Sequence, residues 1–159
     1  MAELTHFDET GASRMVDVSA KSVTSRQARA EGRIIMQPET MALIRDRKLA
    51  KGDVLEVARL AGIMATKRTD ELIPLCHSLG LDGATVEFEL VSEQELRIES
   101  QVTVQGRTGV EMEAMLAVSI SALTVYDMCK SVDRAMRITG IRLLEKSGGK
   151  SGHYVAEPA

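Results

Sequence analysis

The chain has 159 residues, a length typical of a single domain with a sizeable core. Its 20 Lys and Arg residues nearly balance its 23 Asp and Glu residues, so the net charge gives no sign of a nucleic-acid or membrane surface. Trp is absent and 3% of residues are aromatic, which disfavours nucleic-acid binding by base stacking.

The start of the chain is polar, which disfavours a secretory signal. Cys76 and Cys129 are therefore expected to be free thiols in a reducing, cytoplasmic setting. The most apolar run, residues 114–128, is interrupted by polar side chains and is shorter than the roughly 20 residues that cross a bilayer. These features predict a soluble protein.

The first half of the chain predicts an arm, a strand and two helices. No periodic pattern is sustained over residues 1–25, which we interpret as an N-terminal arm. Partial alternation predicts a strand over 29–37, and Pro38 favours a short helix over 38–47. Asp53 and Glu56 predict a capping box for a longer helix that ends near residue 67. Its expected apolar face consists of Val54, Val57, Ala58, Ala61, Met64 and Ala65.

The second half predicts a hairpin followed by a long helix. Apolar and polar residues alternate over 85–90 and again over 96–104. This pattern indicates two antiparallel strands with one face exposed to solvent. Thr108 and Glu111 predict a second capping box. The helix that follows is apolar around most of its surface and is expected to end near Ser131, buried on more than one side.

A last strand over 136–144 completes the predicted fold. Its apolar residues change parity at Gly140, which predicts a β-bulge. The element order β, αα, ββ, α, β is typical of an α+β, ferredoxin-like split βαβ fold with an antiparallel sheet covered by helices on one face. We therefore expect one catalytic domain over 26–147 and a flexible C-terminal tail over 148–159. The long helix that ends near Ser131 is apolar on more than one side, which suggests that another subunit buries part of its surface.

The loop from Lys67 to His77 is the first candidate for chemistry, because it holds charged groups, a thiol and an imidazole between a helix and a strand. Adjacent Cys76 and His77 rarely form a ligand pair, and no CxxC or HxxxH spacing exists, so a metal site is disfavoured. A Cys–His nucleophilic pair is disfavoured because neighbours in an extended loop point apart. His77 is either a hydrogen-bonding or proton-transferring group or an ordinary loop histidine.

Asp127 and Lys130 stand three residues apart near the end of the long helix. They are either an ordinary surface pair or a functional pair. The functional interpretation rests on the apolar neighbours of Asp127, which are expected to desolvate its carboxylate partly and to tune its pKa for acid–base catalysis. Asp127 follows Glu113 by 14 residues, roughly 21 Å along a helix. A shared site would therefore need two chains.

The segment Lys146–Gly152 resembles a phosphate loop, but Leu144 occupies the position where Walker A spacing requires the first glycine. This disfavours an ATPase. A terminal tail and a flap that contacts phosphate both remain open.

Several segments together resemble the MoaC family of molybdenum-cofactor biosynthesis. The matching stretches are Met15-Val-Asp-Val-Ser-Ala-Lys21, Lys51-Gly-Asp-Val54, Lys67-Arg-Thr69, Leu72-Ile-Pro-Leu-Cys-His77, Thr108-Gly-Val-Glu-Met-Glu-Ala114, Leu123-Thr-Val-Tyr-Asp-Met-Cys-Lys130 and Leu143-Leu-Glu-Lys-Ser-Gly-Gly-Lys-Ser-Gly152. One departure is Ser78, where the family usually has proline.

The resemblance implies a lyase that converts (8S)-3',8-cyclo-7,8-dihydroguanosine 5'-triphosphate, a cyclised dihydro-GTP, to cyclic pyranopterin monophosphate and pyrophosphate. It implies Asp127 as the catalytic residue, with Lys51 and Lys130 tied to the chemistry. The implied substrate-binding residues are Leu75, Cys76, His77, Met112, Glu113, Arg26, Lys67, Glu111, Lys146 and Lys150.

The resemblance further implies homohexamers, built as trimers of dimers with sites at subunit interfaces, and an upstream radical S-adenosylmethionine enzyme. It implies no organic cofactor and no required metal. Whether Mg²⁺ accompanies the triphosphate of the substrate is left open. The alternative from another class is a non-catalytic ferredoxin-like regulatory module that binds a nucleotide at a dimer interface.

Overall fold

The structure is a computed structural model that describes residues 6–49 and 52–158. The sheet has five antiparallel strands in the order β2-β3-β1-β4-β5. These strands are β1 Thr24–Ile35, β2 Gly83–Leu90, β3 Glu95–Gly106, β4 Arg137–Ser147 and β5 Tyr154–Val155. The helices are α1 Pro38–Arg45, α2 Val54–Thr66, α3 Thr69–Leu72 and α4 Glu111–Cys129.

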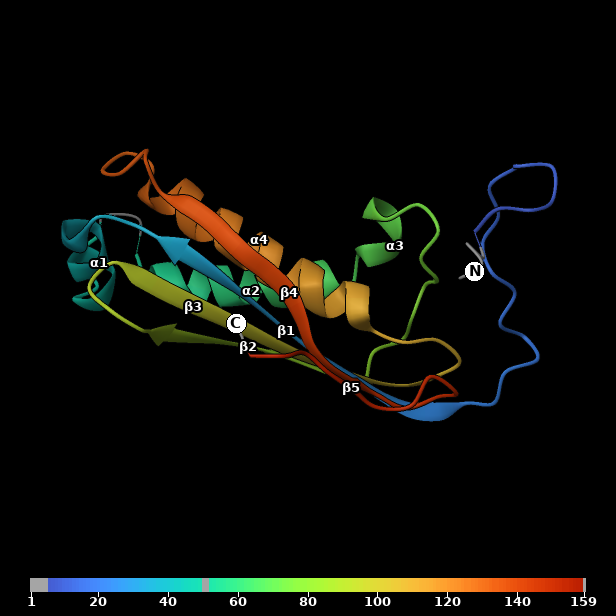
Figure 1. Cartoon of the computed structure of the whole chain (residues 1–159). Coiled ribbons are helices and arrows are strands. Elements are labelled where there is room, and N and C mark those ends of the chain that lie inside the picture. Colours follow the sequence, from blue (N-terminus) through green and yellow to red (C-terminus); the bar gives the residue numbers. More distant parts are fainter. Residues whose placement is uncertain (1–5, 50–51, 159) are drawn as a thin grey trace.

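This arrangement confirms the predicted α+β ferredoxin-like fold. The two long helices, α2 and α4, pack against each other and cover the same face of the sheet (Figure 1). The central strand β1 pairs with β3 on one side and β4 on the other, as a split βαβ unit requires. The short strand β5 extends the sheet beyond β4.

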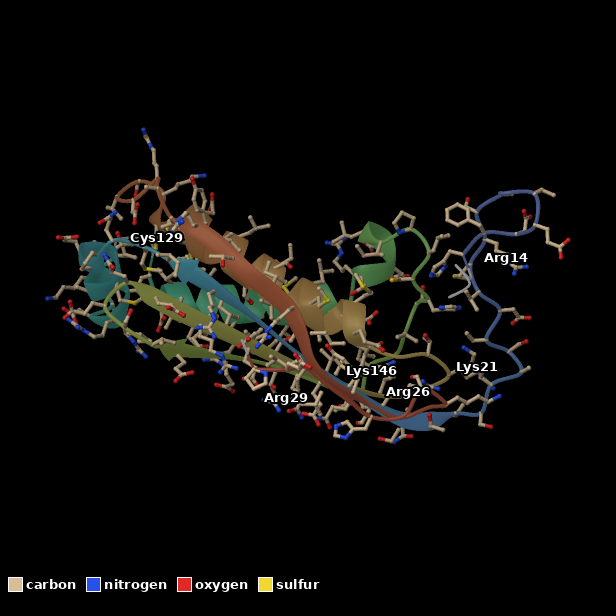
Figure 2. All side chains as sticks on the ribbon, viewed as in Figure 1. Arg14, Lys21, Arg26, Arg29, Cys129 and Lys146 are labelled. Atoms are coloured by element: carbon tan, nitrogen blue, oxygen red, sulfur yellow. The ribbon has the colours of Figure 1, made fainter. Side chains whose placement is uncertain are left out.

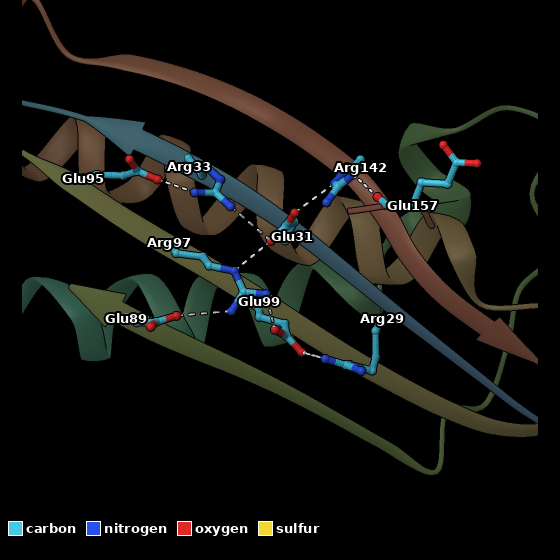
Figure 3. Close-up of polar contacts among 9 residues, drawn as sticks. All are labelled: Arg29, Glu31, Arg33, Glu89, Glu95, Arg97, Glu99, Arg142 and Glu157. Carbon is cyan, nitrogen blue, oxygen red and sulfur yellow. Dashed lines mark hydrogen bonds and ion pairs between the residues drawn. The ribbon is translucent and has the colours of Figure 1, made fainter. Parts of the chain in front are cut away.

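Alternation along β1 separates the core from the outer face of the sheet. Ala28, Ala30 and Ile34 are fully buried beneath the helices. Arg29 and Arg33 belong to the opposite face, where they pair with glutamates from neighbouring strands (Figure 3). The helices therefore cover an apolar surface and leave a charged one on the other side.

Two predicted local features are confirmed. The side chain of Asp53 accepts a hydrogen bond from the Glu56 backbone N–H at 3.3 Å and caps α2. The β1–β4 register shifts opposite Gly140, which has a φ of +63° that suits glycine in a bulge.

Other local predictions are wrong in detail. The N-cap of α4 is Val110, without a side-chain capping bond, so the predicted Thr108–Glu111 capping box does not form. The Glu111 carboxylate instead lies 3.1 Å from Lys146 Nζ on β4. The first strand begins at Thr24 rather than near residue 29, because it pairs with β3 as far as Gly106.

The predicted apolar face of α2 is also divided. Val54, Ala58 and Ala65 are buried, whereas Val57 and Met64 are about half exposed, at 45% and 52%. Gly62 rather than a larger residue lies against α4, which lets the two helices approach closely. Part of the apolar surface of α2 is therefore uncovered in the single chain.

Helix α4 is long and apolar enough to cross a membrane by length and composition alone. Its packing explains this composition, because α4 contacts α2 on one side and strands β1, β3 and β4 on another. The expectation of burial on more than one side is confirmed. We interpret α4 as the central core helix.

Candidate active site

A cavity of about 530 Å³ lies at the N-terminal end of α4. Three parts of the chain meet there: the N-terminal arm, the loop that follows α3 and the first turn of α4 (Figure 1). Its lining residues are His6, Val16, Val18, Lys21, Ile73, Pro74, Leu75, Cys76, His77, Leu79, Thr108, Gly109, Glu111, Met112 and Glu113. We call this the arm cavity.

His77 is held against the N-terminal arm. Its Nε2 lies 2.7 Å from the carbonyl oxygen of Val16, which can only accept. Nε2 therefore carries a proton and donates it, and in the neutral ring Nδ1 is an acceptor. This contact satisfies one ring nitrogen and orients the imidazole at the wall of the cavity.

Glu113 is the buried acid of the cavity, with 4% of its surface exposed. Burial, together with the nearby charges of Glu111 and Asp70, raises the pKa of its carboxyl group to about 7. The carboxyl group is thus divided between its protonated and ionised forms near neutral pH. Such a group can donate or accept a proton, which suits general acid–base work.

Cys76 is a poor nucleophile in this environment. Burial, followed by the negative charges of Glu113 and Asp70, raises the pKa of its thiol. Both cysteines remain thiols, as predicted. Cys76 therefore contributes a neutral, weakly polar surface to the arm cavity.

Basic residues border the arm cavity on the side of β1 and β4. Arg26 donates from Nε to the Gly106 carbonyl at 2.9 Å and from Nη2 to the Arg107 carbonyl at 3.1 Å. Lys146 Nζ contacts Glu111, and Lys150 lies on the turn after β4. The structure brings these cations to the same end of the molecule as His77 and Glu113.

Asp127 and Lys130 lie at the other end of α4. They form an ion pair, with side chains 64% and 52% exposed. The expected partial desolvation of Asp127 is therefore wrong within this chain: Val125 and Met128 face the core, while Asp127 faces outward. Figure 2 shows Cys129 near this end, far from Lys21, Arg26 and Lys146.

The remaining candidates are distributed as follows. Lys67 is the exposed C-cap residue of α2, at the end near the arm cavity but not among its lining residues. Lys51 lies outside the described residues. Within residues 6–49 and 52–158, no three His, Cys, Asp or Glu side chains are grouped as metal ligands would be.

The sequence reasoning missed the part played by the N-terminal arm in the cavity wall. Val16, Val18 and Lys21 line the cavity, although no periodicity marks this segment. The available signal was the stretch Met15–Lys21, which is part of the family resemblance but was given no role residue by residue.

The protein has an α+β fold of ferredoxin-like topology, with a cavity lined by basic and acidic residues at one end of its core helix. Residues 15–149 match the MoaC family, and the chain belongs to this family.

Three relatives that match this chain over nearly their whole length carry one name. The chain is 63% identical to the cyclic pyranopterin monophosphate synthase of a Methylobacterium species, over 100% of both chains. It is 62% identical to the protein of that name from Chloroflexus aurantiacus, over 96% of this chain and 94% of the relative. The match to the Desulfitobacterium hafniense protein is 58% over 98% of this chain and 95% of the relative. These matches support a catalytic protein over a non-catalytic nucleotide-binding module.

Proposed function

We propose that the protein is a cyclic pyranopterin monophosphate synthase, a lyase that releases pyrophosphate from the cyclised dihydro-GTP named above. The observation that carries this proposal is the 63% identity over the full length of a relative with this name. The arm cavity supports it, because the family-matched residues Leu75–His77 and Met112–Glu113 all line it.

The reaction needs groups that move protons and cations that balance a triphosphate. Glu113 supplies a carboxyl group with a pKa of about 7, and His77 supplies an oriented imidazole. Arg26, Lys146 and Lys150 supply positive charge beside the cavity. We assign Asp127, Lys130 and Lys51 to proton transfer and Lys67 to substrate binding, as the family resemblance implies.

The assigned proton-transfer groups and the arm cavity belong to one site only if two chains build it. Glu113 and Asp127 lie on one continuous helix, roughly 21 Å apart. The exposed Asp127–Lys130 pair needs a second surface to remove it from water. We propose that the arm cavity of one copy receives Asp127 and Lys130 from another.

Exposed apolar side chains on the outer faces of α2 and α4 support this assembly. Val57, Leu60 and Met64 are 45%, 59% and 52% exposed on α2, and Leu123 is 53% exposed on α4. A row of half-exposed aliphatic side chains is typical of a surface that another chain covers. A homohexamer built as a trimer of dimers is our proposed assembly, in a cytoplasmic setting and with a radical S-adenosylmethionine enzyme supplying the substrate.

Within the chain, we propose that the arm extends over 1–25 and the catalytic domain over 26–147. In the structure β1 begins at Thr24, so the first two residues of this strand belong to the proposed arm. The segment 148–159 follows the domain and includes the short strand β5.

Incubation of the protein with the cyclised dihydro-GTP tests the function directly. We expect one equivalent of pyrophosphate and a pterin product with its characteristic absorbance. A non-catalytic nucleotide-binding module would bind the compound and return it unchanged, and that result would contradict the proposal.

A further inference from the structure

The turn that joins α4 to β4 follows directly on the Asp127–Lys130 pair. This α4–β4 turn comprises residues 130–136, and Lys130 is also the C-cap residue of α4. The Lys130 N–H donates to the Tyr126 carbonyl at 2.8 Å, so the pair belongs to the last turn of the helix. The last turn of a helix frays readily, because its final carbonyls have no partner within the helix. The position of the pair therefore depends on what holds the α4–β4 turn.

Asp133 holds this turn from within the protein. It is buried, with 5% of its surface exposed. Its Oδ1 accepts a hydrogen bond from the Ala135 N–H at 3.0 Å, and its Oδ2 accepts one from the Gln37 N–H at 2.8 Å. Thr40 Oγ1 donates to the same Oδ2 at 3.4 Å. One carboxylate thus joins the α4–β4 turn to a segment that lies 96 residues away in the sequence.

The segment that Asp133 contacts is the N-terminus of α1. Gln37 is the N-cap residue of α1 and makes no side-chain capping bond of its own. In a capping box a side chain of the helix itself accepts the N-cap N–H, whereas here Asp133 accepts it from another part of the chain. The positive end of the helix dipole also favours a carboxylate at this place. Because Met41 and Ile44 of α1 are buried in the core, α1 is a fixed anchor for the turn.

Two further bonds connect the α4–β4 turn to the neighbours of the pair. Tyr126, which precedes Asp127, donates from its phenolic hydroxyl group to the Arg134 carbonyl at 3.2 Å. The Asp133 N–H donates to the carbonyl of Cys129, the residue before Lys130, at 3.1 Å. A turn that Asp133 fixes on α1 is therefore bonded to the last turn of α4 at two points.

The supporting residues are buried, whereas the pair that they support is exposed. Cys129 and Met136 are 0% and 6% exposed, on the same side as Asp133. The Asp127 and Lys130 side chains are 64% and 52% exposed. Exposed side chains that must act on a ligand lose conformational freedom when they meet it, and a rigid backbone beneath them reduces this loss.

We propose that Asp133 is a positioning residue for the Asp127–Lys130 pair. By fixing the α4–β4 turn on α1, it holds the last turn of α4 in the orientation in which the pair reaches the arm cavity of another copy. This inference rests on the proposed function and deepens it. A displacement of about 1 Å at a reacting group can reduce turnover by about 100-fold, so an anchor of this kind has a direct effect on rate.

Steady-state kinetics of the whole protein with the cyclised dihydro-GTP test this role, at a temperature at which every variant is folded. We expect Asp133→Ala to lower kcat by about tenfold or more. KM should stay within about twofold, because the arm cavity lies at the other end of α4. Asp133→Asn keeps one oxygen acceptor for one of the two N–H groups and should restore part of kcat.

Ser121→Ala is the matched control for these kinetics. It removes another buried hydrogen bond of α4, from Ser121 Oγ to the Ala58 carbonyl at 3.0 Å, without touching the α4–β4 turn. This variant should lose stability and keep a normal kcat when folded.

Amide hydrogen exchange tests the same role without turnover. In Asp133→Ala the amides of Gln37 and Ala135 lose their acceptor and should exchange faster. We expect the Lys130 amide, which donates to the Tyr126 carbonyl, to exchange about tenfold faster as well, because the last turn of α4 loses its anchor. If Asp133 served only to cap α1, the Lys130 amide would stay as protected as in the wild type.

A normal kcat in folded Asp133→Ala, or an unchanged Lys130 amide, would overturn the inference. An equal loss of kcat in Ser121→Ala would do the same, since it would trace the effect to general destabilisation. The proposed function fails separately. A wild-type protein that leaves the cyclised dihydro-GTP unchanged would contradict the function, whereas exchange of the Lys130 amide would still decide whether Asp133 fixes the pair.

Discussion

The two ends of α4 offer opposite environments to their carboxylates. At the N-terminal end Glu113 is 4% exposed, shielded by the arm and by the loop that carries His77. At the C-terminal end the Asp127 side chain is 64% exposed and paired with Lys130. One end therefore has a sheltered cavity, and the other has the acid–base pair that the family resemblance implies. This contrast is the basis of our proposal that two chains build each site.

The largest expected effect is that of Asp127→Asn. We expect kcat to fall by about 100-fold or more, because a lost general acid or base has effects of this size. Thermal unfolding should be nearly unchanged, since the side chain is exposed. Asp46→Asn is the matched control, because Asp46 forms a similar exposed pair with Lys48, and it should keep normal turnover. Near-normal pyrophosphate release by Asp127→Asn would remove the C-terminal end from the mechanism.

Glu113→Gln tests the sheltered end through stability. The folded pKa of about 7 lies above the ordinary 4.5, so the stabilisation that this group contributes is fully present below pH 4.5 and lost as the pH rises through 7. Glutamine does not titrate. The variant should therefore gain stability relative to the wild type with rising pH, on the order of 2–3 kcal/mol at pH 8.

Urea unfolding at pH 5 and pH 8 measures this difference. Glu39→Gln, in the exposed first turn of α1, is the control and should not change the pH dependence. A Glu113→Gln variant with the same pH dependence as the wild type would mean that the acid is not buried as described.

Gly62→Ala tests the close helix contact that holds the two ends in place. A Cβ there would lie 2.9 Å from the Ala117 carbonyl oxygen and closer still to Ser121 Oγ, so α2 and α4 must separate. We expect a loss of about 1–3 kcal/mol in the free energy of unfolding. Gly80→Ala, where an added Cβ meets nothing within 4 Å, should cost far less. Equal costs for the two variants would contradict the packing of α2 on α4.

Lys130→Met should have the smallest effect on stability, less than about 0.5 kcal/mol, because exposed i,i+3 ion pairs contribute little. Turnover should still fall sharply if Lys130 meets the substrate. Arg68→Met breaks another exposed i,i+3 pair, with Glu71, and provides the stability control. A larger unfolding cost for Lys130→Met than for Arg68→Met would indicate a structural role.

Local patterns predicted the fold well because its main signals are short in range. The Asp53 cap needs a partner three residues away, and the Gly140 bulge follows from a change of parity within one strand. Contacts between distant segments could not be predicted from such local patterns. Lys146 pairs with Glu111 from β4, and the Val16 carbonyl holds His77 from 61 residues away.

The environment of Asp127 shows a different limit. Its apolar neighbours in sequence suggested burial, but successive residues of a helix point in directions about 100° apart. Val125 and Cys129 face the core while Asp127 faces outward. The sequence places both halves of the candidate site on one helix and predicts their separation, whereas the exposure of Asp127 is visible only in the structure.

Subunit complementation tests the central claim that two chains build each site. Asp127→Asn and His77→Ala, each expected to be inactive alone, would be mixed under conditions that exchange subunits. Random reassembly should then restore activity to about a quarter of the sites, because those sites combine an intact Asp127 from one chain with an intact His77 from another. A mixture that exchanges subunits yet stays as inactive as its two components would contradict the account.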